Sequence, residues 1–225
     1  TNELRKAKPC PMHSRDHWSA QSSIHMSIAD PKKARELYQN MYDEVKHRVD
    51  NGISGINQEE KYRFMLYGLP PWHALNFFDQ LAERGWGMVR QPQTPEQPLD
   101  LSWVKDPVER YVRFKNRSVA THIDEEFPNP KENAEVRAEI AQKGFSNKLQ
   151  AADIKTYQCD GAFHHSNLTC HVGAASQMLL PHQIMDAYKV PNVIVAGDIV
   201  DTRVFDPEDA LRKCEAFEET MDHYR

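Results

Sequence analysis

The residues best suited to chemistry lie between positions 157 and 171, where imidazole, amide and thiol groups follow a strand-like run. His164 and His165 carry the side chain that transfers protons most readily near neutral pH. Cys170 follows Asn167 by three residues and His165 by five, and the sequence after it favours a helix. A helix start stabilises the thiolate that soft metals and iron-sulfur clusters bind. We therefore predict catalysis by His164 or His165 and metal ligation by Cys170, against the alternatives of a packed polar loop and a small buried thiol.

The composition is that of a globular protein. The chain has 225 residues, of which 40% are hydrophobic, and a formal net charge of −5. This supports a buried core and gives no basic surface for nucleic acid, so we expect no nucleic-acid partner. No apolar run approaches the roughly 18 residues that a membrane span needs, and the first residues do not resemble a signal peptide. We expect a cytoplasmic protein with no membrane partner.

The cysteines are too scattered for a disulfide framework, and they form no CxxC pair (Cys10, Cys159, Cys170 and Cys214). Reduced thiols are the default in such a chain. We expect Cys159 and Cys214 in the core. A cluster bound at Cys170 would need its other ligands from elsewhere, and the start at Thr1 suggests that an upstream portion is missing.

Strand-like and helix-like runs alternate along most of the sequence. We predict a connector and a long helix over residues 1–57, with the helix beginning at Pro31, and an α/β domain over residues 58–225. The strands are expected near residues 62–67, 85–90, 154–163 and 191–198, and the later helices near 72–83, 106–116, 174–188 and 207–224. This alternation predicts an open, mostly parallel sheet of about four strands with helices on both faces, Rossmann-like or flavodoxin-like.

The carboxyl ends of parallel strands share one rim, where open α/β sheets bind ligands. Trp72, following Pro70 in the first strand-to-helix turn, could pack a flat apolar substrate. Asn167 follows the third strand, and Arg203 follows the fourth, where it could bind an anionic group. We predict these four residues as substrate-binding; the alternatives are a tight turn around Trp72 and simple capping around Arg203.

Three segments carry a resemblance to a known family: Tyr62 to Pro70, Cys159 to Cys170, and Val190 to Glu219. Their order and spacing resemble the 2-hydroxyacyl-CoA dehydratase and benzoyl-CoA reductase family. Within it the chain looks most like the C-terminal half of a cluster-bearing catalytic subunit of ATP-dependent benzoyl-CoA reductase.

This resemblance implies a [4Fe-4S] cluster beside an acyl-CoA site, with Cys170 at the position of a family cluster cysteine and the other ligands in the absent N-terminal half. It implies benzoyl-CoA or a related acyl-CoA as substrate, reduced to a cyclic diene-carbonyl-CoA. The implied partners are a homologous catalytic subunit, ATP-hydrolysing electron-activating subunits and an upstream ferredoxin, so ATP is not bound by this chain. His164 or His165 would donate the proton.

Two other functions fit the same resemblance. One is a 2-hydroxyacyl-CoA dehydratase subunit, which eliminates water by radical chemistry. The other is a structural partner subunit of the same fold without an active cluster.

Overall fold

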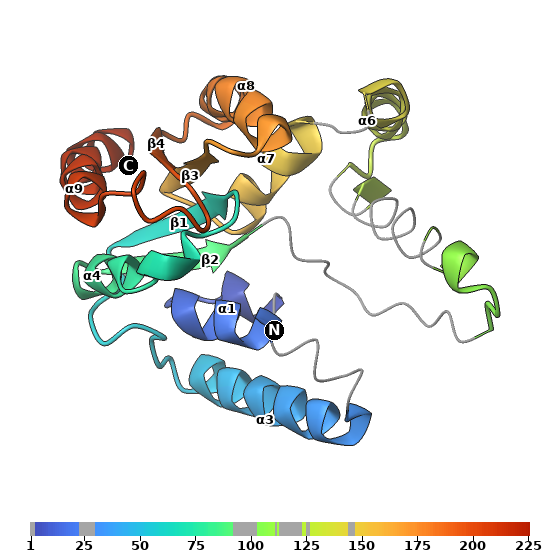
Figure 1. Cartoon of the computed structure of the whole chain (residues 1–225), viewed down its shortest axis with the longest axis horizontal. Helices are drawn as coiled ribbons and strands as arrows, with labels where there is room; N and C mark the ends of the chain where they lie inside the picture. The colour runs from blue at the N-terminus through green and yellow to red at the C-terminus, as the bar shows by residue number, and fades with distance from the viewer. Residues whose placement is uncertain are drawn as a thin grey trace. The chain divides into compact units, whose positions relative to one another are not determined.

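The computed structural model describes residues 3–22, 30–91, 103–110, 112, 123–124, 127–143 and 147–225. Two compact units are distinguished along the chain, one made of residues 1–91 and 154–225 and the other of residues 92–153. The first unit contains a β-sheet, and the second contains helix α6 (Pro130–Lys143) (Figure 1). Helix α7 (Asn147–Thr156) crosses the division between them.

The sheet of the first unit has four strands, all parallel, in the order β2-β1-β3-β4. The strands are β1 (Tyr62–Tyr67), β2 (Trp86–Arg90), β3 (Gly161–Asn167) and β4 (Asn192–Gly197). This confirms the predicted parallel α/β fold. The chain runs from β1 outward to β2 and then returns to the other side of β1, so the switch in strand order falls between β1 and β3. Ligands of doubly wound sheets bind at the carboxyl side of such a switch point.

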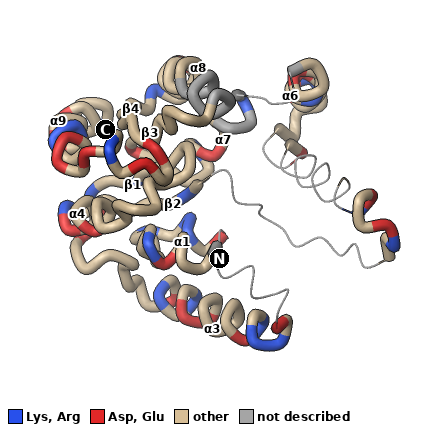
Figure 2. The backbone as a smooth tube through the Cα atoms, viewed as in Figure 1, with Lys and Arg blue, Asp and Glu red and all other residues tan. Residues whose placement is uncertain are grey.

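Helices of the first unit begin where the sequence supplies caps. The Asp30 carboxylate accepts a hydrogen bond from the Lys33 backbone N–H at the start of α3 (Pro31–Asp50), and Asp206 does the same for two backbone N–H groups of α9 (Pro207–Tyr224). Both helices have proline in the first turn, where no hydrogen bond is lost. Charges of both signs are interspersed along α3 and α9 (Figure 2). None of the described helices combines the length and apolar character that a bilayer crossing requires.

The two faces of the sheet are covered by different helices. One face packs an aromatic core against α4 (Phe77–Glu83), α9 and α1 (Ser14–Ser22). Its central rings are Phe64, Phe77, Phe78 and Phe163, each at most 1% exposed. The other face contacts α8 (His171–Tyr188). One of these contacts is a hydrogen bond from the side-chain amide of Asn192 in β4 to the carbonyl of Pro181 in α8. The prediction of helices on both faces is confirmed.

The N-terminal segment differs from the predicted connector. Residues Glu3–Lys6 form the 3-10 helix η1, and α1 follows it closely. Trp18 of α1 is 0% exposed, with its ring centroid 4.5 Å from that of Phe78. The burial of this indole makes the segment part of the core. The sequence did not indicate this, because a single buried tryptophan produces no periodic pattern. The predicted boundary after residue 57 stays a prediction.

The third strand was predicted too early. Residues 154–156 end α7, and β3 begins only at Gly161. His164 and His165 therefore lie inside the strand and not in the loop after it. The helix predicted over 72–83 is divided into the 3-10 helix η3 (Trp72–Ala74) and α4, whereas the end of the helix predicted near 106–116 lies outside the described residues.

Candidate functional site

The candidate site is the carboxyl rim of the sheet at the switch point, where the loops after β1, β3 and β4 begin. Gly68 turns the chain after β1 with a φ of 93°, a conformation that favours glycine. Its carbonyl accepts a hydrogen bond of 2.8 Å from the Gln91 side chain at the end of β2. The next carbonyl, that of Leu69, accepts from His165 Nδ1 in β3. Hydrogen bonds between neighbouring strand ends thus fix the first loop of the rim.

His165 lies on the aromatic face of the sheet and is 0% exposed. Its ring meets that of Phe205 edge-on, with centroids 5.9 Å apart. Burial lowers its pKa below the usual histidine value. The imidazole is therefore neutral at physiological pH, with its proton on the nitrogen that donates to Leu69.

His164 lies on the opposite face and is also 0% exposed. It stacks on Tyr67 with ring centroids 4.8 Å apart, and its Nε2 donates to the Asn192 side-chain carbonyl at 2.8 Å. Its Nδ1 has no hydrogen-bond partner among the described residues. Burial lowers its pKa to about 4. Adjacent strand residues point to opposite faces, so the pair does not act as one polar group. A catalytic role for either residue stays a prediction.

Cys170 stands between β3 and α8, at the rim, and is partly exposed. The other three thiols are enclosed: Cys10, Cys159 and Cys214 are 2%, 8% and 0% exposed. The expected core placement of Cys159 and Cys214 is confirmed. Within the part of the chain that the structure describes, no three His, Cys, Asp or Glu side chains gather to hold a metal ion. Cys170 thus fits as one accessible ligand and not as a complete site.

The turn that leads to Cys170 is bonded to the end of β4. Thr169 donates its hydroxyl to Asp198 at 2.6 Å, and its backbone N–H points to the Asn167 side-chain carbonyl at 3.3 Å. Asp198 is 0% exposed, and its carboxylate also accepts from two backbone N–H groups of its own loop. These hydrogen bonds, the Thr169 hydroxyl first, lower the Asp198 pKa to about 2. The rim therefore contains a buried carboxylate that stays ionised.

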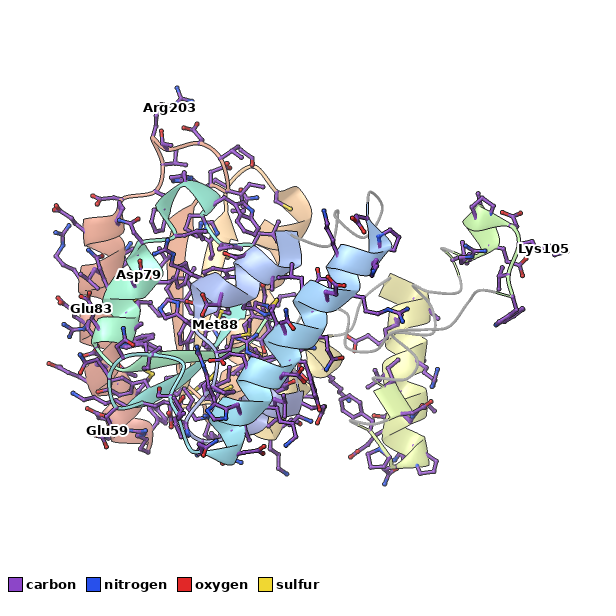
Figure 3. The ribbon with its side chains drawn as sticks, turned by 90° about the horizontal axis from the view of Figure 1, so that it is seen from below. Glu59, Asp79, Glu83, Met88, Lys105 and Arg203 are labelled. Carbon is purple, nitrogen blue, oxygen red and sulfur yellow. The ribbon has the colours of Figure 1, made fainter. Side chains whose placement is uncertain are left out.

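The four predicted substrate-binding residues divide into two kinds. Trp72 is 39% exposed and the Arg203 side chain 85% exposed, so both can reach a ligand in solvent. Arg203 forms an ion pair of 2.6 Å with Asp201 and lies at the far end of the unit from Glu59, which precedes β1 (Figure 3). Pro70 is buried, and Asn167 is 9% exposed with its carbonyl bonded inside the turn. Pro70 and Asn167 therefore shape the rim from within.

Sequence reasoning missed two residues of this rim. His73 is exposed on η3, with its ring centroid 6.0 Å from that of Phe205. Its place directly after Trp72, in the same strand-to-helix turn, was the available signal. Thr169 was also passed over, although threonine between Asn167 and a helix start is typical of a side-chain-bonded turn. Leu168 in the loop after β3 and Val200 in the loop after β4 add apolar surface to the rim, at 55% and 73% exposed.

The fold and this rim define a doubly wound α/β protein with one accessible thiol at the switch point. Comparison with family models gives a match to the family described as 2-hydroxyglutaryl-CoA dehydratase, D-component, over residues 1–221. The chain therefore belongs to this family, which confirms the resemblance seen in the sequence.

Two curated relatives are similar to this chain at low identity. The (R)-2-hydroxyisocaproyl-CoA dehydratase alpha subunit of Clostridioides difficile is 22% identical over 200 residues, 88% of this chain and 44% of that protein. A benzoyl-CoA reductase subunit of Thauera aromatica is 24% identical over 199 residues, 85% of this chain and 42% of that protein. The chain thus spans less than half the length of either relative.

Proposed function

We propose that this chain is part of a catalytic subunit of ATP-dependent benzoyl-CoA reductase, which dearomatises the ring of benzoyl-CoA. The observation that carries the proposal is the placement of Cys170, a partly exposed thiol at the switch-point rim of a chain that belongs to the dehydratase family. The benzoyl-CoA reductase relative supports the particular reaction.

Cys170 would hold one corner of a [4Fe-4S] cluster, with the remaining ligands outside the described residues. When bound, such a cluster would supply electrons at low potential. The chemistry favours Cys170 over Cys10 and Cys214, because a ligand must bind the metal as a thiolate. Burial raises the pKa of the Cys214 thiol to about 12 and raises that of Cys10, which favours their protonated forms.

The rim offers groups that suit an aromatic acyl-CoA. Trp72, with the exposed apolar side chains Leu168 and Val200, would pack the flat ring and exclude water from it. Arg203 would attract a phosphate or carboxylate of the CoA portion. Both predicted proton donors are 0% exposed, and the Nδ1 proton of His165 is already donated to the Leu69 carbonyl. Of the two, His165 lies nearer the rim, because its ring bonds the loop after β1 whereas His164 faces α8.

Further subunits are part of the proposal. Both curated relatives are named as subunits of larger enzymes. We expect a homologous catalytic subunit beside this one, and ATP-hydrolysing subunits that pass electrons from a ferredoxin. ATP itself would be bound by those partners.

A 2-hydroxyacyl-CoA dehydratase is the second candidate. Two observations favour it: the family model is described as a dehydratase component, and the relative from Clostridioides difficile is a dehydratase subunit. The same thiol and the same apolar rim would then serve elimination of water from a 2-hydroxyacyl-CoA. A structural subunit of the same fold, with no cluster of its own, is the third.

The test uses the intact subunit with its partners, purified without oxygen. We expect bound iron and sulfide, lost in Cys170→Ala and retained in Cys214→Ala, whose sulfur is enclosed in the core. With ATP and a reductant, the preparation should remove the aromatic absorbance of benzoyl-CoA. Dehydration of a 2-hydroxyacyl-CoA instead would select the second candidate, and a wild-type subunit without iron would leave the structural role.

A further inference from the structure

We propose that Thr169 and Asp198 are positioning residues for Cys170. In this proposal the buried carboxylate at the end of β4 holds the turn that presents the thiol, and its fixed negative charge is hydrogen-bonded to Thr169, the residue before the thiol. The significance of this for electron transfer rests on the proposed function, but the positioning itself can be measured without a cluster.

The central contact is the hydrogen bond of 2.6 Å from the Thr169 hydroxyl to Asp198 Oδ2. The other carboxylate oxygen accepts from the backbone N–H groups of Val200 at 3.0 Å and Asp201 at 3.1 Å. Hydrogen bonds to an ionised acceptor are the strong ones, and a carboxylate held by several donors remains charged. Asp198 is thus a rigid anionic anchor to which the loop after β3 is attached.

Every residue of the turn before Cys170 is bonded in place. Leu168 N–H donates to the carbonyl of Gly197 at 2.9 Å, and Cys170 N–H closes the turn by donating to the carbonyl of Asn167 at 3.1 Å. Gly197 also fixes the approach of the two strands, because a Cβ there would lie 2.7 Å from His165 Nε2. The turn before Cys170 is therefore held by the end of β3 through Asn167 and by the end of β4 through Gly197.

This arrangement pre-organises a ligand. A thiolate whose backbone is already fixed loses less entropy when it binds a metal, and supporting residues of this kind keep a site from being loose. A negative charge near a cluster ligand also lowers the reduction potential of the bound group, since net charge and hydrogen bonds around the sulfurs set that potential. Both effects suit a site that must donate electrons at low potential.

A purely structural role would make the same hydrogen bonds, so the test compares variants by thiol reactivity. Thr169 is exposed, and Thr169→Val removes the hydroxyl while keeping the side-chain shape. In the intact apo subunit we expect iodoacetamide to alkylate Cys170 about tenfold faster in Thr169→Val than in wild type, because the turn opens when its anchor is lost. Thr169→Ser, which retains the hydroxyl, should restore the wild-type rate. The sites are assigned by peptide mass mapping, and slow reaction of the three enclosed cysteines shows that the variants are folded.

Equal Cys170 rates in wild type and Thr169→Val would overturn the positioning proposal. A second arm addresses the charge: in the cluster-loaded subunit, Asp198→Asn should shift the reduction potential upward, and the control Asp201→Asn, whose carboxylate pairs with exposed Arg203, should not. An unchanged potential in Asp198→Asn would overturn the electrostatic part. If the wild-type subunit binds no iron, the proposed function fails, and the alkylation rates still decide the positioning.

Discussion

The two ends of the sheet use their polar residues differently. At the amino end, the side chain of Arg63 near the start of β1 is enclosed by the protein. It is 3% exposed and forms an ion pair of 2.6 Å with Glu60. The guanidinium also donates to backbone carbonyls of residues 5, 6, 7 and 157. At the carboxyl end, Trp72 and Arg203 extend into solvent, and Cys170 is partly exposed. The amino end satisfies these polar groups internally, whereas the carboxyl end leaves some of its polar side chains available to a ligand.

This difference separates stability from function within one sheet. The amino end ties the N-terminal segment to β1, so its charges stabilise the fold. At the carboxyl end, the buried charge of Asp198 supports the turn before Cys170. Substitutions at the amino end should therefore change the free energy of unfolding, and substitutions among the exposed rim residues should change binding and reactivity.

The largest expected effect is at the amino end. Arg63→Met should lower the free energy of unfolding by about 3–5 kcal/mol, because it leaves the Glu60 carboxylate buried without its cation. Urea denaturation of the intact protein measures this loss. The double variant Arg63→Met/Glu60→Gln should recover part of it, since no uncompensated charge then remains. A double variant less stable than Arg63→Met would show that the stability loss does not come from an unpaired Glu60 carboxylate.

A smaller effect is expected between the two ends, at His164. Its pKa is lowered from 6.5 to about 4 in the folded protein. Between these two pH values the unfolded chain therefore binds a proton that the folded chain does not bind. The contribution of neutral His164 to the free energy of unfolding is complete above pH 6.5. It is lost as the pH falls towards 4, and the total loss is at most about 3 kcal/mol. Urea midpoints measured across this range should fall steadily.

The variant His164→Phe isolates this contribution. Phenylalanine can keep the stacking on Tyr67 but does not titrate. The pH dependence should become shallower and not vanish, because burial also lowers the pKa values of His17 and His165. An unchanged pH dependence in His164→Phe would assign the acid sensitivity to the other histidines whose pKa values burial lowers, His13, His17 and His165.

Much of the fold was accessible from sequence because local signals agreed with it. Helices α3 and α9 have an aspartate cap and a proline in the first turn, and three of the strands are short apolar runs next to turns. β3 was misplaced because the apolar residues that end α7 resemble a strand over so short a range. α1 was missed because its stability comes from Trp18 packing on a distant helix.

The site was accessible only in part for a similar reason. The parallel fold places Cys170 at the rim once β3 is recognised, and this part was predictable. The burial of His164 and His165 depends on which faces α8 and the aromatic core cover, which the pattern of a short strand does not reveal. The bond from Thr169 to Asp198 joins residues 29 positions apart, and no local spacing encodes it.

The smallest effect on stability is expected at the carboxyl end of the sheet, and it tests whether the two ends use their charges differently. Arg203→Gln should leave the urea midpoint unchanged, because the ion pair with Asp201 is exposed to solvent and its side chain is 85% accessible. The same variant should weaken binding of a CoA thioester to the intact subunit, measured by calorimetry, if this charge attracts the anionic portion of the ligand. Arg203→Lys retains the charge and should bind more tightly than Arg203→Gln. Equal affinities for all three proteins would remove Arg203 from the binding surface, and a lowered midpoint would mean that the carboxyl end, like the amino end, uses its charges for the fold.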